Sequence, residues 1–324
     1  MKQDKKICYF VSYLLFLVSC FLLLFTTTSC TLQNQNDKKF IRIGYMPNVT
    51  HAPALVGINK NFFQDELGSN IKLKPIHFVV GNSIVDAFIS NQLDFAYVGP
   101  GPFINAVYRR IPLNLLSNAT NSGSLIVGVN NITDLKKNMR IAVPQYGNTQ
   151  DLILRTYLKN NNLLDKVKII AIPSQDTGTA FFTMSIDAAC LPEPWGSILI
   201  EKKICKILVN ENEIFNGGNY PVTVLVVSGL FAKKEPELVK KILNAHNLSI
   251  DYILKNQDDA INITASEISQ ISKKEIDETI IKKAFQRCTF TNAVNLNILK
   301  ELAKTGVNAG YYKEGFSKKI NIFQ

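Results

Sequence analysis

Residues 141–155, IAVPQYGNTQDLILR, combine the residue types and spacing best suited to hold a small ligand. The apolar run 141–143 is suited to a buried strand, and residues 144–147 break it. Asn148 or Thr149 can then cap a helix. A helix start offers unpaired N–H groups and a partial positive charge, so this turn suits a small anion or a polar ligand.

The same order of strand, polar turn and helix start occurs at four other places. The four turns that follow apolar strands are residues 46–51, 81–83, 99–102 and 192–197. Alternating strands and helices predict parallel sheets wound by crossover helices, and such sheets bind ligands beyond the carboxyl ends of their strands. All five turns lie at that end, so we place the functional site there.

None of the five turns contains Arg or Lys, which limits how an anion can be held. Neutral donors must then hold the ligand, and each neutral hydrogen bond contributes only about 0.5–1.5 kcal/mol. Besides backbone N–H groups, the candidate donors are Asn48, Asn82, Ser83, Asn148, Thr149 and Gln150. For Asn148 and Thr149, the alternative is that they serve only as helix caps.

Four other candidates differ in character from these donors. Gly99 and Pro100 start a Gly-Pro-Gly-Pro turn, which either lets the backbone approach a ligand closely or simply stiffens the turn. Tyr45 and Trp195 can wall an apolar or aromatic ligand. Glu193 repels an anion unless it is paired. It suits an amine or a cationic ring, or it only meets a helix dipole.

The sequence lacks a pattern for metal, cofactor or covalent chemistry. Three scattered histidines form no Cys/His cluster, so no metal site and no cofactor are expected. Phosphate-binding Gly-rich loops and a nucleophile elbow are absent. His51 is a candidate ligand donor or simply a polar turn residue, whereas His77 and His246 look structural. We therefore do not expect an enzyme.

The order of these motifs resembles that of a known family. The carriers are Ala52-Pro53-Ala54, Gly-Asn-Ser at 81–83, Leu-Asp-Phe-Ala at 93–96, Gly-Asn-Thr-Gln-Asp at 147–151 and Pro-Glu-Pro-Trp at 192–195. Together they resemble the solute-binding proteins of ABC importers of the nitrate/sulfonate/taurine type, most closely the aliphatic-sulfonate branch. The resemblance covers roughly residues 40–315. Residues 181–186 depart from it, because relatives have a Gly-Gln-Ile turn there.

The resemblance implies an α/β, two-lobed periplasmic-binding-protein-like fold of type II. Each lobe is then a mainly parallel sheet flanked by helices, and two crossing strands form the hinge. We expect residues 40–123 and 224–324 to form lobe one and residues 124–223 to form lobe two. The strands 124–129 and 222–228 are the expected crossings, and only helices are expected after the second one. The sequence alone would also allow these helices to form a separate domain.

The resemblance also implies a function. A small sulfonate- or taurine-like solute is captured between the lobes and passed to ABC permease subunits in the membrane. The alternatives are nitrate, or a heteroaromatic solute such as a thiamine pyrimidine precursor held by Tyr45, Trp195 and Glu193. A pyrimidine-forming enzyme of the same fold, with His51 as the reacting group, is a rival that the lack of catalytic pairs disfavours.

The first residues have the layout of a bacterial lipoprotein signal. Three lysines precede a charge-free run over residues 7–25, and small residues follow up to Cys30. We expect residues 1–30 to be the signal peptide, Cys30 to carry the lipid, palmitate included, and residues 31–39 to be a tether. Lipidation at Cys20 and an uncleaved anchor remain open. All three alternatives place the rest of the chain on the extracytoplasmic face of the cell membrane.

The composition of the chain limits which other molecules it is expected to bind. The 324 residues are 46% hydrophobic, and a net charge of +10 is spread along the chain rather than grouped in blocks. Nucleic-acid binding therefore has no support, and we expect a monomer that binds a small solute. Cys190, Cys205 and Cys288 remain after the leader, and a Cys190–Cys205 disulfide is left open.

Overall fold

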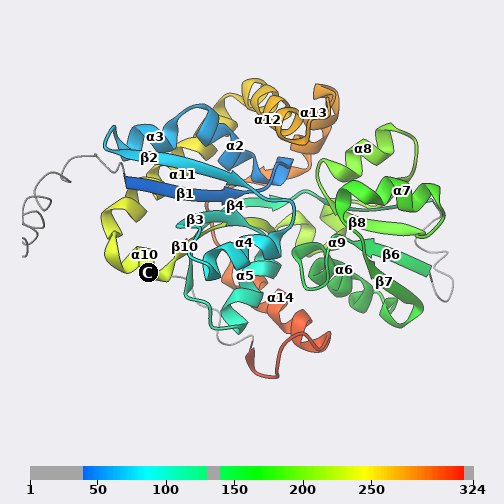
Figure 1. The fold of residues 1–324 in the computed structure, drawn as a ribbon. Coiled ribbons are helices and arrows are strands. Elements are labelled where there is room, and N and C mark those ends of the chain that lie inside the picture. The colour runs from blue at the N-terminus through cyan, green and yellow to red at the C-terminus, as the bar shows by residue number, and fades with distance from the viewer. Residues whose placement is uncertain (1–38, 130–138, 317–324) are drawn as a thin grey trace, which may run out of the picture. The chain divides into compact units, whose positions relative to one another are not determined.

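The computed structural model describes residues 39–129 and 139–316 (Figure 1). The chain divides into two units after Lys39, and the second unit, which begins at Phe40, carries the fold. The expected signal peptide, the lipid site Cys30 and nearly all of the expected tether lie outside the described residues. No helix in the described ranges has the length and apolar character needed to cross a membrane.

The first sheet has six strands in the order β11-β4-β10-β3-β1-β2. Their bounds are β1 Lys39–Tyr45, β2 Ile71–His77, β3 Phe95–Val98, β4 Leu113–Ser122, β10 Pro221–Ser228 and β11 Cys288–Phe290. Strand β1 runs parallel to β3, whereas β10 runs antiparallel to both β3 and β4. Strands far apart in the chain therefore meet in the middle of this sheet.

The second sheet has five strands in the order β7-β6-β8-β5-β9. Their bounds are β5 Ser124–Gly128, β6 Met139–Val143, β7 Val167–Ala171, β8 Ala188–Pro192 and β9 Lys206–Val209. Strand β6 is parallel to β7 and β8, and β5 is antiparallel to β8 and β9. Both sheets are thus mixed rather than mainly parallel, because strands next to the crossings run against their neighbours.

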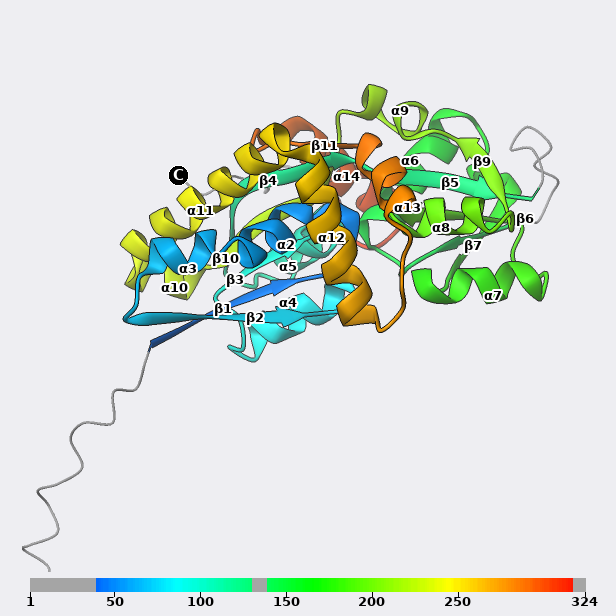
Figure 2. The ribbon, with the colours of Figure 1, turned by 90° about the horizontal axis from the view of Figure 1, so that it is seen from above.

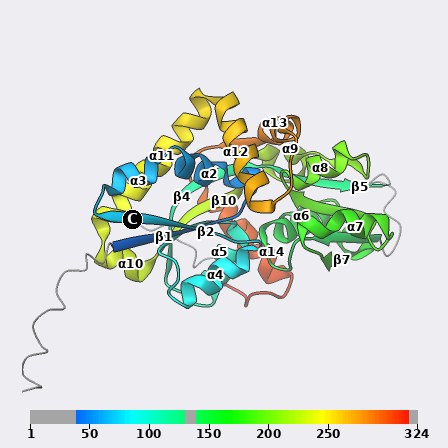
Figure 3. The same cartoon turned by 45° about the horizontal axis from the view of Figure 1, so that its top comes forward.

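Helices cover both faces of each sheet (Figures 1 and 3). The α-helices are α2 Ala52–Asn59, α3 Phe62–Leu67, α4 Gly81–Ile89, α5 Pro100–Tyr108, α6 Thr149–Asn160, α7 Thr177–Phe182, α8 Trp195–Glu201, α9 Glu211–Ile214, α10 Gly229–Lys234, α11 Pro236–Lys255, α12 Gln257–Ser272, α13 Glu278–Gln286 and α14 Leu296–Asn308. Short 3₁₀ turns are η1 Val49–His51, η3 Leu164–Lys166, η4 Ser174–Asp176 and η5 Asn216–Gly218.

Three apolar clusters hold these layers together. One packs α2, α11, α12 and α13 on one face of the first sheet. A second lies under α4, α5 and α14 on the other face and continues to α6 and the second sheet. The third packs α7 and α8 on the far face of the second sheet. Because burial of apolar area drives folding, the shared second cluster couples the two sheets.

The chain passes from the first sheet to the second through a single residue, Gly123, between β4 and β5. Its φ is +74°, and a Cβ there would lie 2.5 Å from the Sγ of Cys288. Only glycine satisfies both constraints without strain. The chain returns between β9 and β10, through α9 and η5.

Two expectations about strands are wrong. The strand before the turn 81–83 neither reaches that turn nor is apolar throughout: β2 is Ile71–His77, an edge strand in which Lys72 and Lys74 alternate with Ile71 and Leu73. The segment after the second crossing is not helical throughout, because β11 pairs antiparallel with the end of β4. A strand of three residues is too short to show a period of two.

Candidate functional site

A cavity of about 290 Å³ lies where the carboxyl ends of strands from both sheets meet. Its walls come from the turns after β1, β2, β3, β6, β7 and β8, together with Val222 of β10 and the last turn of α12. The lining residues are Met46, Pro47, Asn48, Thr50, His51, His77, Val79, Val80, Gly81, Gly99, Pro102, Pro144, Gln145, Asn148, Thr149, Gln150, Ser174, Gln175, Pro192, Trp195, Val222, Ile271 and Ser272. Over the described ranges, this lining contains no Arg, Lys, Asp or Glu.

Several helices begin at the wall of this cavity. The N-caps of α2, α4, α5 and α6 are His51, Val80, Gly99 and Asn148. Helix α8 begins at Trp195, which also lines the cavity. Each helix start carries a partial positive charge. Helix α5 has no free N–H group in its first turn, because Pro100 and Pro102 lack one and the Gly101 N–H donates to Thr149 Oγ1. The cavity therefore favours negative charge although its described wall has no Arg or Lys side chain.

Asn148 and Thr149 serve the cavity and the fold together. The Asn148 Oδ1 accepts the Asp151 N–H at 2.9 Å, which makes Asn148 a true N-cap. The Thr149 Oγ1 accepts the N–H of Gly101, at the start of α5, at 3.2 Å. Both residues also line the cavity. Asn148 therefore caps α6 at the cavity wall, and Thr149 bonds the first turn of α5 from the same wall.

His51 presents an uncharged donor at the wall. Its side chain is completely buried, and its Nδ1 accepts the N–H of Met46 at 3.2 Å. Burial lowers the pKa of His51 to about 3, so the ring is neutral at physiological pH. Because Nδ1 is an acceptor, the proton is on Nε2. That Nε2–H has no protein partner among the described residues.

The other polar wall residues are amides and hydroxyls, together with His77. The Thr50 Oγ1 donates to the Asn48 Oδ1 at 2.9 Å, and both side chains are buried. The Gln150 Nε2 donates to the Ser124 Oγ at 3.3 Å, which connects the wall to β5. These bonds hold the amide groups in place, so their orientation at the wall is set before a ligand arrives.

Much of the remaining lining is apolar. Met46, Val80, Val222 and Ile271 contribute aliphatic surface, and Trp195 adds an indole ring. An apolar wall with a few placed polar groups is the usual composition of a small-molecule site. The cavity thus suits a ligand with one polar end and one apolar end.

The structure brings six of the eleven predicted ligand residues into the lining and leaves five outside it. Asn48, His51, Gly99, Asn148, Thr149 and Trp195 line the cavity, whereas Tyr45, Asn82, Ser83, Pro100 and Glu193 are not part of its lining. Tyr45 is packed in the apolar cluster beneath α2 and α11. Asn82, Ser83 and Pro100 lie in the first turns of α4 and α5, beside lining residues.

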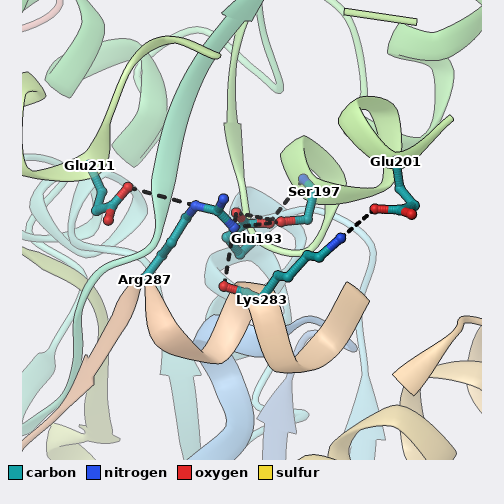
Figure 4. A network of polar contacts seen from close by, with 6 residues as sticks. All are labelled: Glu193, Ser197, Glu201, Glu211, Lys283 and Arg287. Atoms are coloured by element: carbon teal, nitrogen blue, oxygen red, sulfur yellow. Dashed lines mark hydrogen bonds and ion pairs between the residues drawn. The ribbon is translucent and has the colours of Figure 1, made fainter. Parts of the chain in front are cut away.

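Glu193 belongs to a separate network of polar contacts (Figure 4). Its side chain is 0% exposed, and its carboxylate accepts the N–H and the hydroxyl of Ser197 at 3.2 and 2.9 Å. The guanidinium of Arg287 lies 3.3 Å from the same carboxylate. Burial raises the pKa of Glu193, while Arg287 and Ser197 act in the opposite direction.

Sequence reasoning missed several wall residues, for two different reasons. Ser174 and Gln175 follow β7 in the same order of strand, turn and helix, so a signal for them was present. Ile271 and Ser272 end a long helix that begins far along the chain from the other wall residues. Nothing local marks such residues, because their place depends on how α12 packs.

The three thiols in the described part of the chain are free. Cys190 is buried in the core, and Cys205 and Cys288 are half-buried. No group of His, Cys, Asp or Glu side chains in the described ranges is arranged to hold a metal ion.

Two mixed sheets with a ligand-sized cavity between their carboxyl ends define a fold of the periplasmic-binding-protein type, and solved structures have the same fold. The alkanesulfonate-binding protein SsuA from Xanthomonas axonopodis pv. citri, bound to MOPS, matches with a TM-score of 0.71 and 16% identity over 85% of this chain and 94% of that one. The periplasmic nitrate-binding protein NrtA from Synechocystis PCC 6803 matches with a TM-score of 0.74 and 13% identity over 87% and 84%.

The chain belongs to the NMT1-like family, whose profile matches residues 34–269. A relative from Bacillus subtilis (strain 168), named "Putative aliphatic sulfonates-binding protein", is 25% identical over 75% of this chain and 73% of its own length. The taurine-binding periplasmic protein of Escherichia coli K12 is 28% identical over 58% of this chain and 59% of its own length.

Proposed function

We propose that this chain is the extracytoplasmic solute-binding component of an ABC importer and that its cavity captures a small organic anion of the sulfonate class. The observation that carries the proposal is a cavity wall with five helix starts and no charged Arg, Lys, Asp or Glu in the described ranges. Family membership and the names of the relatives support the same class.

The neutral wall suits an oxyanion on physical grounds. Sulfonate oxygens accept hydrogen bonds, and the wall supplies helix-start N–H groups together with the His51 Nε2–H and side-chain amides. Each bond is modest, but exclusion of water from a small cavity strengthens the whole set. The apolar part of the wall then receives the carbon end of the ligand.

The placement of Glu193 favours a plain sulfonate over taurine. An ammonium group in the cavity needs a counter-charge, and no carboxylate belongs to the described lining. Glu193 is paired with Arg287 instead. Burying an unpaired ammonium costs free energy, so we expect taurine to bind more weakly than an alkanesulfonate of similar size.

A heteroaromatic solute is the second candidate. Trp195 offers a surface for ring stacking, and the unpartnered Nε2–H of His51 suits a ring nitrogen that accepts a hydrogen bond. Nitrate, the third candidate, would use the helix starts but leave the apolar wall empty.

The proposal includes a mode of action. Residues 40–123 and 224–324 are proposed to move as one lobe and residues 124–223 as the other. Ligand contacts from both lobes favour the closed form, which the permease subunits then receive. We propose a monomer tethered to the cell membrane through lipidated Cys30. The mass of the N-terminal peptide of membrane-extracted protein tests this anchor.

Calorimetry with ethanesulfonate, taurine and an aminopyrimidine tests the ligand class. We expect ethanesulfonate to bind at least tenfold more tightly than taurine, and the aminopyrimidine not to bind. Tighter binding of taurine would contradict the proposed role of the uncharged wall. Tight binding of the aminopyrimidine alone would favour the second candidate.

A further inference from the structure

Helix α13 packs on the first sheet with its apolar residues and makes ion pairs with elements of the second sheet. Its apolar residues Ile281, Ala284 and Phe285 belong to the core cluster of the first sheet. One of its two lysines, Lys283, and Arg287 just after its last turn, reach carboxylates on α8, in the turn after β8 and on α9 instead (Figure 4). Figure 2 shows α13 between α12 and α8, which lie on different sheets.

The ion pairs of Arg287 and Lys283 differ strongly in how exposed their side chains are. Arg287 has a side chain 20% exposed, and its Nη1 donates to the Glu193 Oε1 at 3.3 Å and to the Ser197 Oγ at 2.9 Å. Its Nε lies 3.8 Å from an oxygen of Glu211. Lys283 pairs with Glu201 at 2.6 Å, but those side chains are 52% and 48% exposed. Exposed pairs contribute little, whereas a buried carboxylate depends on its partner.

Glu193 stands at the junction between the sheets. Its N–H donates to the carbonyl of Gly123, the single residue between β4 and β5, at 2.9 Å. Cys288, the neighbour of Arg287, pairs with Ser122 of β4. The ion pair between Glu193 and Arg287 therefore connects β8 with β11 beside the place where the chain crosses.

Glu193 also lies between two residues of the cavity wall. Pro192 and Trp195 both line the cavity, and Glu193 is directly after the first of them. Its carboxylate accepts two hydrogen bonds from Ser197, in the first turn of α8, which fixes the start of that helix. The position of the Trp195 ring is thereby tied to the carboxylate of Glu193.

We infer that Arg287 is a positioning residue for the cavity, which acts through Glu193 to hold the Pro192–Trp195 turn and the start of α8 against α13. Within the described residues, Arg287 is the one cation in ion-pair contact with this buried carboxylate. Arg287 is absent from the cavity lining, so its effect on a ligand is indirect. The inference rests on the proposed function in placing the ligand in this cavity.

The central variant is Arg287→Met, which keeps the length of the side chain and removes its charge. We expect it to weaken binding of ethanesulfonate by at least tenfold, because Glu193 is left buried without a counter-charge. Glu193→Gln combined with Arg287→Met removes both charges, so the double variant should bind more tightly than Arg287→Met alone. Arg287→Lys should weaken binding by about threefold. Lys283→Met, the matched control on the same helix, should change it by less than twofold.

Hydrogen exchange of the ligand-free protein provides a second measurement that needs no ligand. Arg287→Met should speed exchange at least tenfold in peptides covering residues 190–199, and Lys283→Met should not. Exchange in α11 should stay unchanged in both variants, which separates a local effect from general loss of stability. If Arg287→Met does not fold, Arg287→Lys gives the same comparison at smaller amplitude.

Equal effects of Arg287→Met and Lys283→Met on exchange would overturn the inference, as would a double variant that binds no better than Arg287→Met. If the unaltered protein binds no sulfonate, the proposed ligand class fails. The exchange comparison then still decides whether Arg287 holds the wall.

Discussion

His51 shows how burial turns a titratable side chain into a fixed hydrogen-bond donor. With Nδ1 engaged by the Met46 N–H and a pKa of about 3, the ring stays neutral and keeps its proton on Nε2. A second buried histidine, His246, has its pKa lowered by burial to about 4, and it bonds Tyr97, Ser117 and the backbone of Asn118. Only His51 of the two faces the cavity.

The neutral state of these buried histidines predicts different pH responses for sulfonate binding and for folding stability. With His77, the other histidine of the lining, replaced by Gln, sulfonate affinity should stay constant between pH 8 and 5.5, since the His51 donor does not titrate there. The free energy of unfolding should fall as pH drops below 6.5. Both histidines become protonated in the unfolded chain there, whereas burial keeps them neutral in the folded protein. The loss is about 1.4 kcal/mol per pH unit for each histidine.

Urea unfolding at pH 7 and pH 5 checks this response. His51→Gln should reduce the difference in unfolding free energy between the two pH values by about 2 kcal/mol. His77→Gln is the matched control, because that histidine is exposed. A sulfonate-binding curve of the His77→Gln variant with a midpoint near pH 6 would contradict the neutral His51 donor.

Thr149 joins the cavity wall to the contact between two helix starts, so its hydroxyl has two functions. Thr149→Ala should weaken sulfonate binding by about 1–2 kcal/mol, through loss of a donor at the wall and of the acceptor for the Gly101 N–H. Thr149→Ser keeps the hydroxyl and should retain most of the affinity. Calorimetry on both variants makes the comparison, and equal affinities for Ala and Ser would show that the hydroxyl is not used.

At the scale of elements, Gly123 combines a positive φ with a close contact at the crossing between the sheets. Gly123→Ala should cost about 1–2 kcal/mol for its positive φ and more for the contact with Cys288 Sγ. Gly310→Ala is the matched control, because its φ is +79° but nothing lies within 4 Å of a Cβ there. Adding Cys288→Ala should recover the steric part at Gly123. Denaturant unfolding measures all three, and equal losses at Gly123 and Gly310 would contradict the steric cost.

The elements also show where sequence reasoning succeeds. A strand that ends in a polar turn before a helix can be recognised from its own sequence. The apolar run, the turn and the helix cap follow one another within about fifteen residues. Such signals located β1, β3, β6 and β8 and six of the wall residues.

Other features have no local signal. The pairing of β11 with β4 joins residues far apart in the chain, and Ile271 reaches the wall only because α12 packs where it does. Glu193 looks like a ligand residue in sequence, and its partner Arg287 is far away. Long-range pairing and burial decide these cases, and neither can be read from neighbouring residues.

At the scale of the whole molecule, the two sheets meet through the starts of α5 and α6. A Cβ on Gly101 would lie 2.5 Å from the carbonyl carbon of Asn148 and 2.6 Å from the Thr149 nitrogen. Those atoms are backbone, so they cannot turn aside as a side chain would. Gly101 therefore permits a close approach between an element of the first sheet and one of the second, next to the cavity.

Gly101→Ala should act as a wedge between the two lobes. We expect it to weaken sulfonate binding at least tenfold, because ligand contacts from both lobes require this close approach. Each sheet should still fold, so the far-ultraviolet circular dichroism spectrum should not change.

In small-angle scattering, a saturating sulfonate should reduce the radius of gyration of the unaltered protein but not that of the Gly101→Ala variant. Gly178→Ala is the control, since a Cβ there would meet only the ends of flexible side chains, Leu199 at 3.3 Å and Ile204 at 4.0 Å. A Gly101→Ala protein that binds and contracts normally would show that closure does not pass through this contact.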